Sequence, residues 1–190
     1  MKRNYLLFAA LLLAGTVRAD LIKNGSFEQP LDGTWDTVAN AGATGYWTYS
    51  VVDTLGQPTP GHAAQVYKSL GHSASIYQDV DVSDVNLSLT FDARLRIGAG
   101  SATCWPTAAV VIHYMDAAGT ELGNTKYYVH NEYNDWTTND TAHLIDMSAA
   151  VGWQHYQLAI AQELADNLKG VNAASVKKIR IEMYAYDNGT

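Results

Sequence analysis

A strict two-residue alternation over residues 86–97 constrains this chain more than any other feature. Apolar side chains occupy every second position, and polar or charged side chains occupy the positions between them. Successive side chains of a β-strand point to opposite faces, so the pattern indicates a strand with one buried face. The inward set is Leu87, Leu89, Phe91, Ala93, Leu95 and Ile97, and the outward set is Ser88, Thr90, Asp92, Arg94 and Arg96.

Most of the remaining chain also has the patterns of β-strands. Residues 108–115 and 121–129 flank a turn and predict a hairpin. Further strands are expected over residues 76–82, 153–160 and 176–186. The last of these places Ile179, Ile181 and Met183 inward and Arg180, Glu182 and Tyr184 outward.

These strands predict a single all-β domain, a β-sandwich of two packed antiparallel sheets, because no linker or repeat divides the chain. One short helix is expected over residues 160–169, where apolar residues are spaced by four. The expected inward side chains are Phe27, Leu87, Leu89, Phe91, Leu95, Ile179, Ile181 and Met183.

The first 19 residues have the features of a secretion signal. Lys2 and Arg3 precede an apolar run over residues 5–14, and Val17-Arg18-Ala19 resembles a small-residue cleavage site. The run is shorter than the roughly 20 residues that a membrane-spanning helix needs. We therefore expect residues 1–19 to be removed and residues 20–190 to be secreted, in the periplasm or outside the cell, without a membrane span.

The charge of the chain is acidic, with a formal net charge of −7. The expected signal carries three basic residues and no acidic one, so its removal changes the charge to −10. Binding to nucleic acid or to an anionic membrane requires clustered Lys and Arg, so neither partner is expected. The lone Cys104 cannot form a disulfide within the chain, and it is expected to be a small buried apolar residue.

No catalytic pattern stands out. The Gly-x-Ser-x-Gly turn of many hydrolases is absent from the sequence, and His113, His143 and His155 lack the spacing of zinc ligands. The chain has 12 Tyr and 5 Trp but only 3 Phe. Tyr and Trp combine an apolar ring face with a polar edge, which suits half-wet binding surfaces, although Tyr is also a good strand former.

Several motifs occur in the order found in one group of secreted modules. They are Asn24-Gly25-Ser26-Phe27-Glu28, Gly45-Tyr46-Trp47, the glycine loop at residues 61–66, the paired segments 75–80 and 87–94, and Trp153 before a strand. Together they resemble carbohydrate-binding modules of families four, nine and twenty-two, which have a galactose-binding-like jelly roll. In these modules Asn-Gly-x-Phe-Glu forms the first strand, so a strand is expected at residues 24–28. The closing strand of the family pattern would lie beyond Thr190 and is not found in this sequence.

The resemblance implies a non-catalytic module that binds a polysaccharide or oligosaccharide on one sheet face and adjoining loops. The outward residues expected there are Arg94, Arg96, His155, Gln157, Glu182 and Tyr184, and the candidates for stacking on sugar rings are Trp105, Tyr128 and Trp136. Each polar member could equally belong to a solvated sheet surface. Trp47 and Trp153 are expected to be structural. An attached or associated glycan-degrading enzyme is a possible partner.

The resemblance also implies a structural Ca²⁺ ion held by Glu28. Calcium takes six to eight oxygen ligands, many of them backbone carbonyls. Ser26 and the loop around Lys68 are the expected carbonyl donors, while a strand glutamate without metal is an almost equal alternative. For the whole chain, two other functions stay open: an extracellular structural or adhesive sandwich that binds no glycan, and a small polysaccharide-active enzyme.

Overall fold

The computed structural model describes residues 21–40, 45–53, 61–69, 71–98, 100–134 and 136–188, so the expected signal over residues 1–19 lies outside it. These ranges contain β1 (Asp36–Ala39), β2 (Tyr46–Asp53), β3 (His62–Ser69), β4 (His72–Asp81), β5 (Ser88–Ala93), β6 (Thr107–Met115), β7 (Glu121–His130), β8 (Ala142–Asp146), β9 (Gln154–Ala159), α1 (Ile160–Asn167) and β10 (Lys178–Asp187), with a 3-10 turn at Ala173–Ser175.

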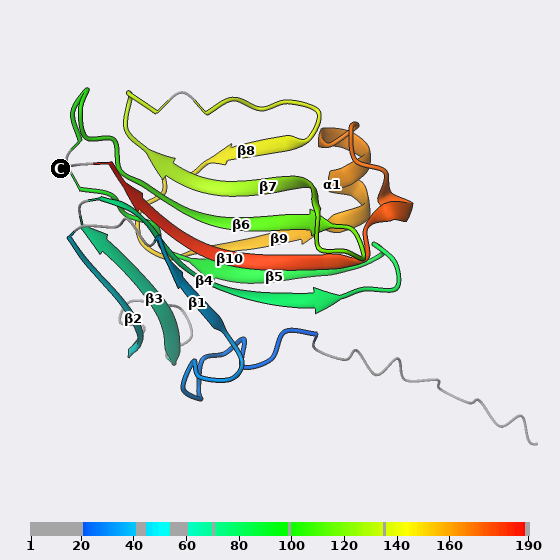
Figure 1. Ribbon diagram of the computed structural model, residues 1–190, viewed down its shortest axis with the longest axis horizontal. Helices are drawn as coiled ribbons and strands as arrows, with labels where there is room; N and C mark the ends of the chain where they lie inside the picture. Colours follow the sequence, from blue (N-terminus) through cyan, green and yellow to red (C-terminus); the bar gives the residue numbers. More distant parts are fainter. Residues whose placement is uncertain are drawn as a thin grey trace, which may run out of the picture.

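Six strands form one large sheet in the order β1-β4-β10-β6-β7-β8 (Figure 1). Its neighbours are antiparallel except for β7 and β8, which run parallel. The second layer contains two separate hydrogen-bonded pairs, β2–β3 and β5–β9. The expected all-β sandwich is confirmed, with the correction that one strand pair is parallel and that the second layer is divided.

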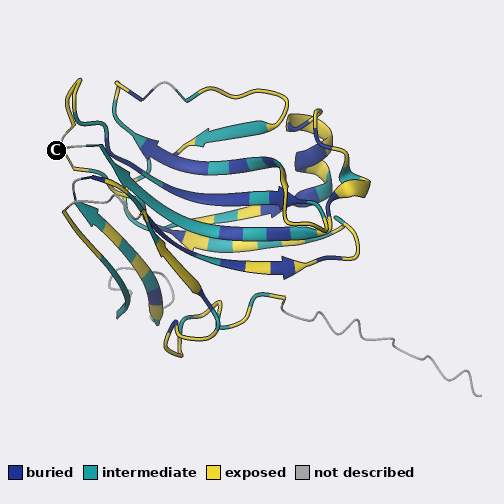
Figure 2. Cartoon of the chain, viewed as in Figure 1, coloured by how far each residue is buried: buried dark blue, intermediate teal, exposed yellow. Residues whose placement is uncertain are grey.

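The core lies between the two layers, and its side chains come from the positions that alternation predicted. Ile179 and Ile181 of β10 are buried, and Ile76 and Ile112 on the neighbouring strands are fully buried. The other expected inward residues are half-buried and pack against this core: Phe27, Leu87, Leu89, Phe91, Leu95 and Met183. Figure 2 shows the same pattern as dark blue segments along β4, β6 and β7.

Across the two layers, aromatic rings extend the core. Phe91 of β5 contacts Tyr156 of β9 and the edge of Tyr127 on β7, with ring centroids 5.3 Å and 5.1 Å apart. On the other side of β5, Ser88, Thr90 and Asp92 are exposed as expected. The hydrogen-bonded strand β5 ends at Ala93, before the end of the sequence alternation. Residues 94–98 still alternate between half-buried and exposed side chains.

The prediction of a strand at residues 24–28 is wrong, because residues 23–26 form a turn and residues 27–28 have no regular secondary structure. Asn24 and Phe27 have positive φ angles of 50° and 56°. The Asn24 side chain closes the turn by accepting a hydrogen bond from the Gln29 amide and donating to the Gln29 carbonyl, at 3.1 and 2.9 Å. Asn and Gly favour such turns, which explains why this segment does not form the strand expected from the motif.

Helix α1 confirms the expected helix and is fixed to the large sheet through a buried carboxylate. Thr125 donates to Glu163 across 2.7 Å, Asn167 donates to it across 2.8 Å, and His143 lies 2.6 Å from the same group. Glu163 is 6% exposed. A buried carboxylate requires such partners, so this network fastens the helix to β7 and β8.

Three side chains outside the expected site, Trp47, Cys104 and Trp153, are partly exposed, and burial had been expected of Cys104. Trp47 was expected to be structural, but it is 37% exposed, and the Lys68 ammonium lies 5.9 Å from its ring centroid. Cys104 is half-buried, and its thiol donates to Asp187 across 3.2 Å. Trp153 is half-buried beneath the guanidinium of Arg94, which lies 5.6 Å from its ring.

Candidate functional site

The outer face of the large sheet carries a row of aromatic side chains. Tyr184 of β10 pairs with Ala109 of β6, which pairs with Tyr128 of β7. Ala109 is small and 1% exposed, because it belongs to a buried cluster with Val111 and Tyr128 against which Trp136, Leu144 and Tyr184 pack. This register places Tyr184 of β10 and Tyr128 of β7 on either side of Ala109.

Six rings form what we name the aromatic platform: Trp105, Tyr128, His130, Trp136, Tyr184 and Tyr186. Tyr184 and Tyr186 stack with an interplanar angle of 7°, and Trp105 lies 5.8 Å from Tyr186. Tyr128 stacks on His130 at 4.7 Å and contacts Trp136 at 5.7 Å. The rings therefore form two groups, one on each side of Ala109.

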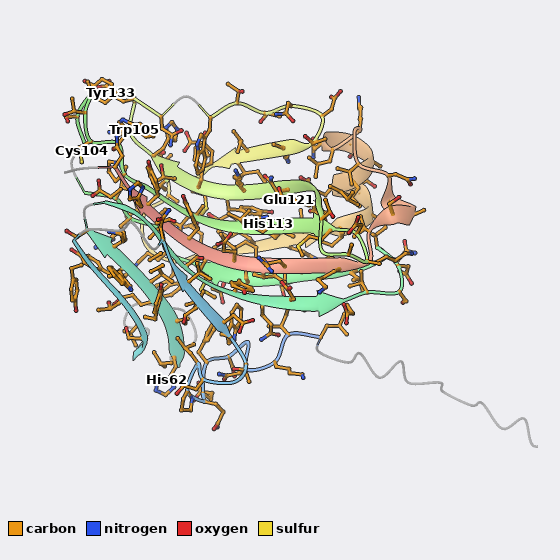
Figure 3. All side chains as sticks on the ribbon, viewed as in Figure 1. His62, Cys104, Trp105, His113, Glu121 and Tyr133 are labelled. Carbon is orange, nitrogen blue, oxygen red and sulfur yellow. The ribbon has the colours of Figure 1, made fainter. Side chains whose placement is uncertain are left out.

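Two loops carry the tryptophans, and side-chain amides fix both. The Trp105 amide donates to Asn188 across 2.6 Å, and Asn131 donates to the Cys104 carbonyl across 3.2 Å. The Trp136 amide donates to Asn134, and Asn134 donates to Thr107 across 2.7 Å. Because Asn134 and Thr107 are buried, this link ties the Trp136 loop to β6. Figure 3 shows Trp105 beside Cys104 at the end of the sheet near the C-terminus.

A second group on the same face is charged, and we name it the charged cluster: Asp79, His113, Glu121, Arg180 and Glu182. The His113 ring lies between two carboxylates, with Nδ1 2.8 Å from Glu121 and Nε2 2.8 Å from Glu182. Burial alone would lower the pKa of His113, but its hydrogen bonds to Glu121 and Glu182 outweigh burial and raise that pKa.

The two carboxylates shift in the opposite direction. Burial would raise the pKa of Glu182, but hydrogen bonds from His113 and Ser75 lower it. The hydrogen bond from His113 also lowers the pKa of Glu121. The three residues therefore form a compact group in which the imidazole bridges two carboxylates, and the shifts favour its protonated form and their ionised forms.

Arg180 and Asp79 form the other half of the charged cluster. The guanidinium donates twice to the carboxylate, at 2.6 and 3.0 Å, and it also lies 3.9 Å from the ring centroid of Tyr77. The hydrogen bond from Arg180 lowers the pKa of Asp79. This bidentate geometry holds a planar cation flat on the sheet surface.

Lys126 connects the charged cluster with the aromatic platform. Its ammonium lies 4.5 Å from the Trp136 ring centroid. Burial lowers the pKa of Lys126, while the charges of Glu121 and Glu182 act in the opposite direction. Tyr128 is only 7% exposed, so it packs beneath the platform and does not present its ring to solvent, contrary to its expected role in stacking. The half-buried rings of the platform lie beside fixed donors and acceptors, which is the combination that a sugar needs.

The residues predicted for the site divide between two faces of the sandwich. Trp105, Tyr128, Trp136, Glu182 and Tyr184 all lie on the outer face of the large sheet. Arg94, Arg96, His155 and Gln157 lie in the second layer, in or beside β5 and β9, and all four are exposed. There His155 is 2.9 Å from Asp92. The structure therefore brings five of the nine predicted residues onto one face.

Sequence reasoning missed His113, Lys126, His130, Arg180 and Tyr186 as members of this face. Tyr186 could have been found, because it continues the outward alternation of Glu182 and Tyr184. His113 lies in a run that is apolar on both sides, where alternation gives no signal. Burial also raises the pKa of Tyr184 to about 12, so its hydroxyl stays a neutral hydrogen-bonding group.

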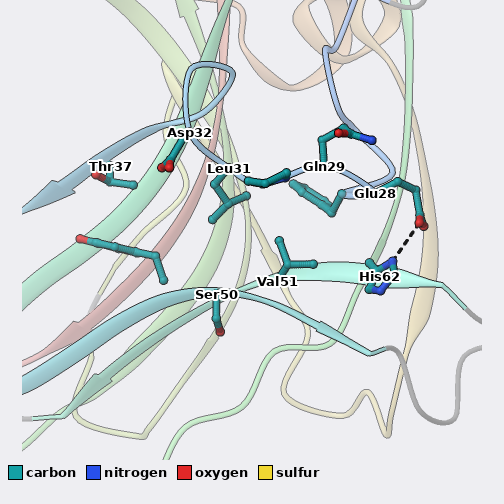
Figure 4. Close-up of a pocket in the computed structure, with 11 residues that line it drawn as sticks. Glu28, Gln29, Leu31, Asp32, Thr37, Ser50, Val51 and His62 are labelled. Atoms are coloured by element: carbon teal, nitrogen blue, oxygen red, sulfur yellow. Dashed lines mark hydrogen bonds and ion pairs between the residues drawn. The ribbon is translucent and has the colours of Figure 1, made fainter.

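Of the predicted calcium ligands, Glu28 lines a pocket of about 560 Å³ between residues 27–32 and strands β2 and β3, whereas Lys68 lies at the other end of β3 from the His62 partner of Glu28. Figure 4 shows Glu28 pointing at His62, with Oε2 2.9 Å from Nδ1. Ser26 is exposed, and the Lys68 ammonium donates to the Ser69 carbonyl across 3.2 Å. Within the described residues, no group of three or more His, Cys, Asp or Glu side chains is arranged to hold a metal ion. A single carboxylate already paired with an imidazole fits calcium poorly.

Comparisons with known proteins show no family for this chain. No family model matches it, and no curated protein matches it. A solved structure, the enzymatically active domain of bacteriophage CBA120 tailspike protein 4, aligns with a TM-score of 0.48 and 11% identity. The alignment covers 87% of this chain but only 19% of the tailspike chain. In the described part of the chain, no helix is long and apolar enough to cross a membrane.

Proposed function

We propose that this protein is a secreted carbohydrate-binding module that binds a polysaccharide chain along the outer face of the large sheet. The observation that carries the proposal is the juxtaposition of the aromatic platform and the charged cluster on one face. Sugars present C–H patches that stack on aromatic rings and hydroxyls that bond to carboxylates and guanidinium groups.

The protonation states of the charged cluster support binding over hydrolysis. A glycosidase pairs one carboxylate with a general acid that keeps its proton until the sugar oxygen takes it. Here the pKa values of both Glu121 and Glu182 are lowered by His113, so neither is set up as that acid. The group is suited to hold fixed hydrogen-bond partners in place.

Affinity gel electrophoresis against a panel of soluble polysaccharides tests the proposal. We expect at least one polysaccharide to retard the wild-type protein, and a Trp136→Ala, Tyr186→Ala double variant to run as it does in a gel without polysaccharide. His155→Ala, on the opposite face, is the matched control and should be retarded like wild type. Equal migration of the wild-type protein in every gel would favour a scaffold without glycan binding. Release of reducing sugar by the purified protein would favour an enzyme.

Calcium is kept as a separate structural proposal at Glu28. It rests on the resemblance of residues 24–28 to the motif Asn-Gly-x-Phe-Glu of those modules. The ion would bind Glu28 and neighbouring carbonyls and would stabilise the N-terminal loop, without a part in sugar binding.

A further inference from the structure

A cleft of about 1340 Å³ separates the two strand pairs of the second layer. Strand β3 lines one side, residues 86–98 line the other, and Leu21, Ile22, Phe27 and Trp35 of the N-terminal segment line it as well. Its floor is made of core side chains of the large sheet, including Ile179, Ile181 and Met183. The cleft therefore opens directly onto the hydrophobic core.

Both sides of the cleft are edges of β-sheets. Among the described strands, β3 pairs with β2 only, and β5 pairs with β9 only. Residues 94–98 extend the line of β5 without joining a ladder. Edge strands present rows of unpaired N–H and C=O groups that can pair with an added strand.

The inward side chains along both edges are apolar but incompletely covered. Leu89, Phe91, Leu95 and Ile97 line the cleft on one side and are only half-buried. Val66 of β3 is half-buried on the other side. An added strand with apolar residues at every second position would cover them in the same way as a normal strand of this layer.

The outward rim of the cleft on the β5 side is basic at residues 94–96, and the acidic lining residue before them, Asp92, is paired with His155 at 2.9 Å. Arg94 and Arg96 are both exposed and alternate with the inward Leu95 and Ile97. Acidic side chains opposite an arginine stabilise a strand pair, whereas basic ones destabilise it. In a chain whose net charge is −7, this local basic edge selects for an acidic partner.

We infer that the cleft between β3 and β5 binds an extended strand of a partner polypeptide by β-augmentation, with apolar residues at alternate positions and acidic residues between them. Backbone groups of the two edges supply the affinity, and the apolar floor with Arg94 and Arg96 supplies the selectivity. The N-terminal run of this chain has the wrong chemistry for the cleft, because residues 1–19 contain three basic residues and no acidic one.

The test uses a fluorescein-labelled peptide of alternating glutamate and valine, about nine residues long to match a strand. Fluorescence anisotropy with the full chain measures its Kd, beside a lysine–valine peptide of the same length. We expect the wild-type protein to bind the glutamate peptide about tenfold more tightly than the lysine peptide, and the Arg94→Glu, Arg96→Glu double variant to reverse this preference. Lys169→Glu, on an exposed turn after α1, is a charge-reversal control away from the cleft and should retain the wild-type preference.

Hydrogen exchange with the glutamate peptide bound locates the contact. Slower exchange at backbone amides of residues 62–69 and 87–98 is the expected result. Absence of binding to both peptides would overturn the inference, as would protection confined to other segments. Self-association of the free protein with protection of the same amides would also overturn it, since a second copy would then fill the cleft.

Discussion

The Nε2 atom of His113 lies 2.8 Å from Oε2 of Glu182, and this contact joins β6 to β10 at the centre of the large sheet. The raised pKa of His113 stabilises the fold below its ordinary pKa of about 6.5, and this contribution is lost as the pH rises through the higher folded value. The lowered pKa values of Glu121 and Glu182 stabilise the fold above about 4.5, and this contribution is lost as the pH falls through the lower folded values.

The first prediction follows from these two signs. Thermal melting across pH should show the contribution of the cluster at its greatest between about pH 4.5 and 6.5. His113→Gln should lower the melting temperature most in this window and less above it. A destabilisation of His113→Gln that does not change with pH would contradict the bridging role of the imidazole.

The second prediction concerns the buried carboxylate of helix α1. Glu163→Ala leaves Thr125, His143 and Asn167 without their shared acceptor, so the free energy of unfolding should fall by about 3 kcal/mol. Urea denaturation measures the change. Asp166→Ala, on the exposed side of the same helix, is the control and should cost less than about 1 kcal/mol. Similar losses in the two variants would show that the network does not fasten the helix.

The third prediction tests calcium at Glu28. If the ion binds there, the wild-type protein should melt at a higher temperature with calcium than with chelator, and Glu28→Gln should remove this difference. Glu132→Gln is the matched control, because Glu132 is an exposed carboxylate away from this loop. Identical melting of the wild-type protein in both conditions would exclude the site and leave Glu28 as the partner of His62.

Alternation predicted which side chains point outward far better than it predicted which sheet they belong to. Arg96, His155, Glu182 and Tyr184 were all expected on one binding face, and all alternate in the same way. The two-residue alternation separates core-facing from solvent-facing side chains within each strand. Both layers of a sandwich have a solvent-facing surface, so alternation does not assign a residue to one layer. The pairing of β10 with β6, and of β5 with β9, is a long-range choice that places these residues on opposite faces.

Local turn chemistry explains the remaining error in the fold. Residues 24–28 were expected to be a strand, yet the Asn24 side chain bonds to its own loop and forms a turn. His113 was missed for a different reason: its strand is covered on one face by the core and lined by Ala109 and Val111 on the other. Because β6 is apolar on both faces, alternation does not distinguish His113 from its neighbours.

The fourth prediction separates stacking from a general effect of exposed tryptophan. Trp136→Ala removes a platform ring and should weaken polysaccharide binding by about 1–3 kcal/mol, which is roughly 5- to 150-fold in Kd. Trp47→Ala removes a tryptophan ring on β2, which is not among the rings of the platform, and should leave the Kd unchanged. Isothermal titration calorimetry measures both, with circular dichroism to verify folding. Equal losses in the two variants would contradict a localised platform.

The most direct test of the central claim uses the five tryptophan indole N–H signals in a ¹H–¹⁵N spectrum. An oligosaccharide from a polysaccharide that retards the protein is titrated into the ¹⁵N-labelled chain. Binding on the outer face of the large sheet predicts that the signals of Trp105 and Trp136 shift, while those of Trp35, Trp47 and Trp153 stay in place. Saturable shifts confined to Trp35, Trp47 or Trp153 would contradict the account and place the sugar elsewhere on the protein.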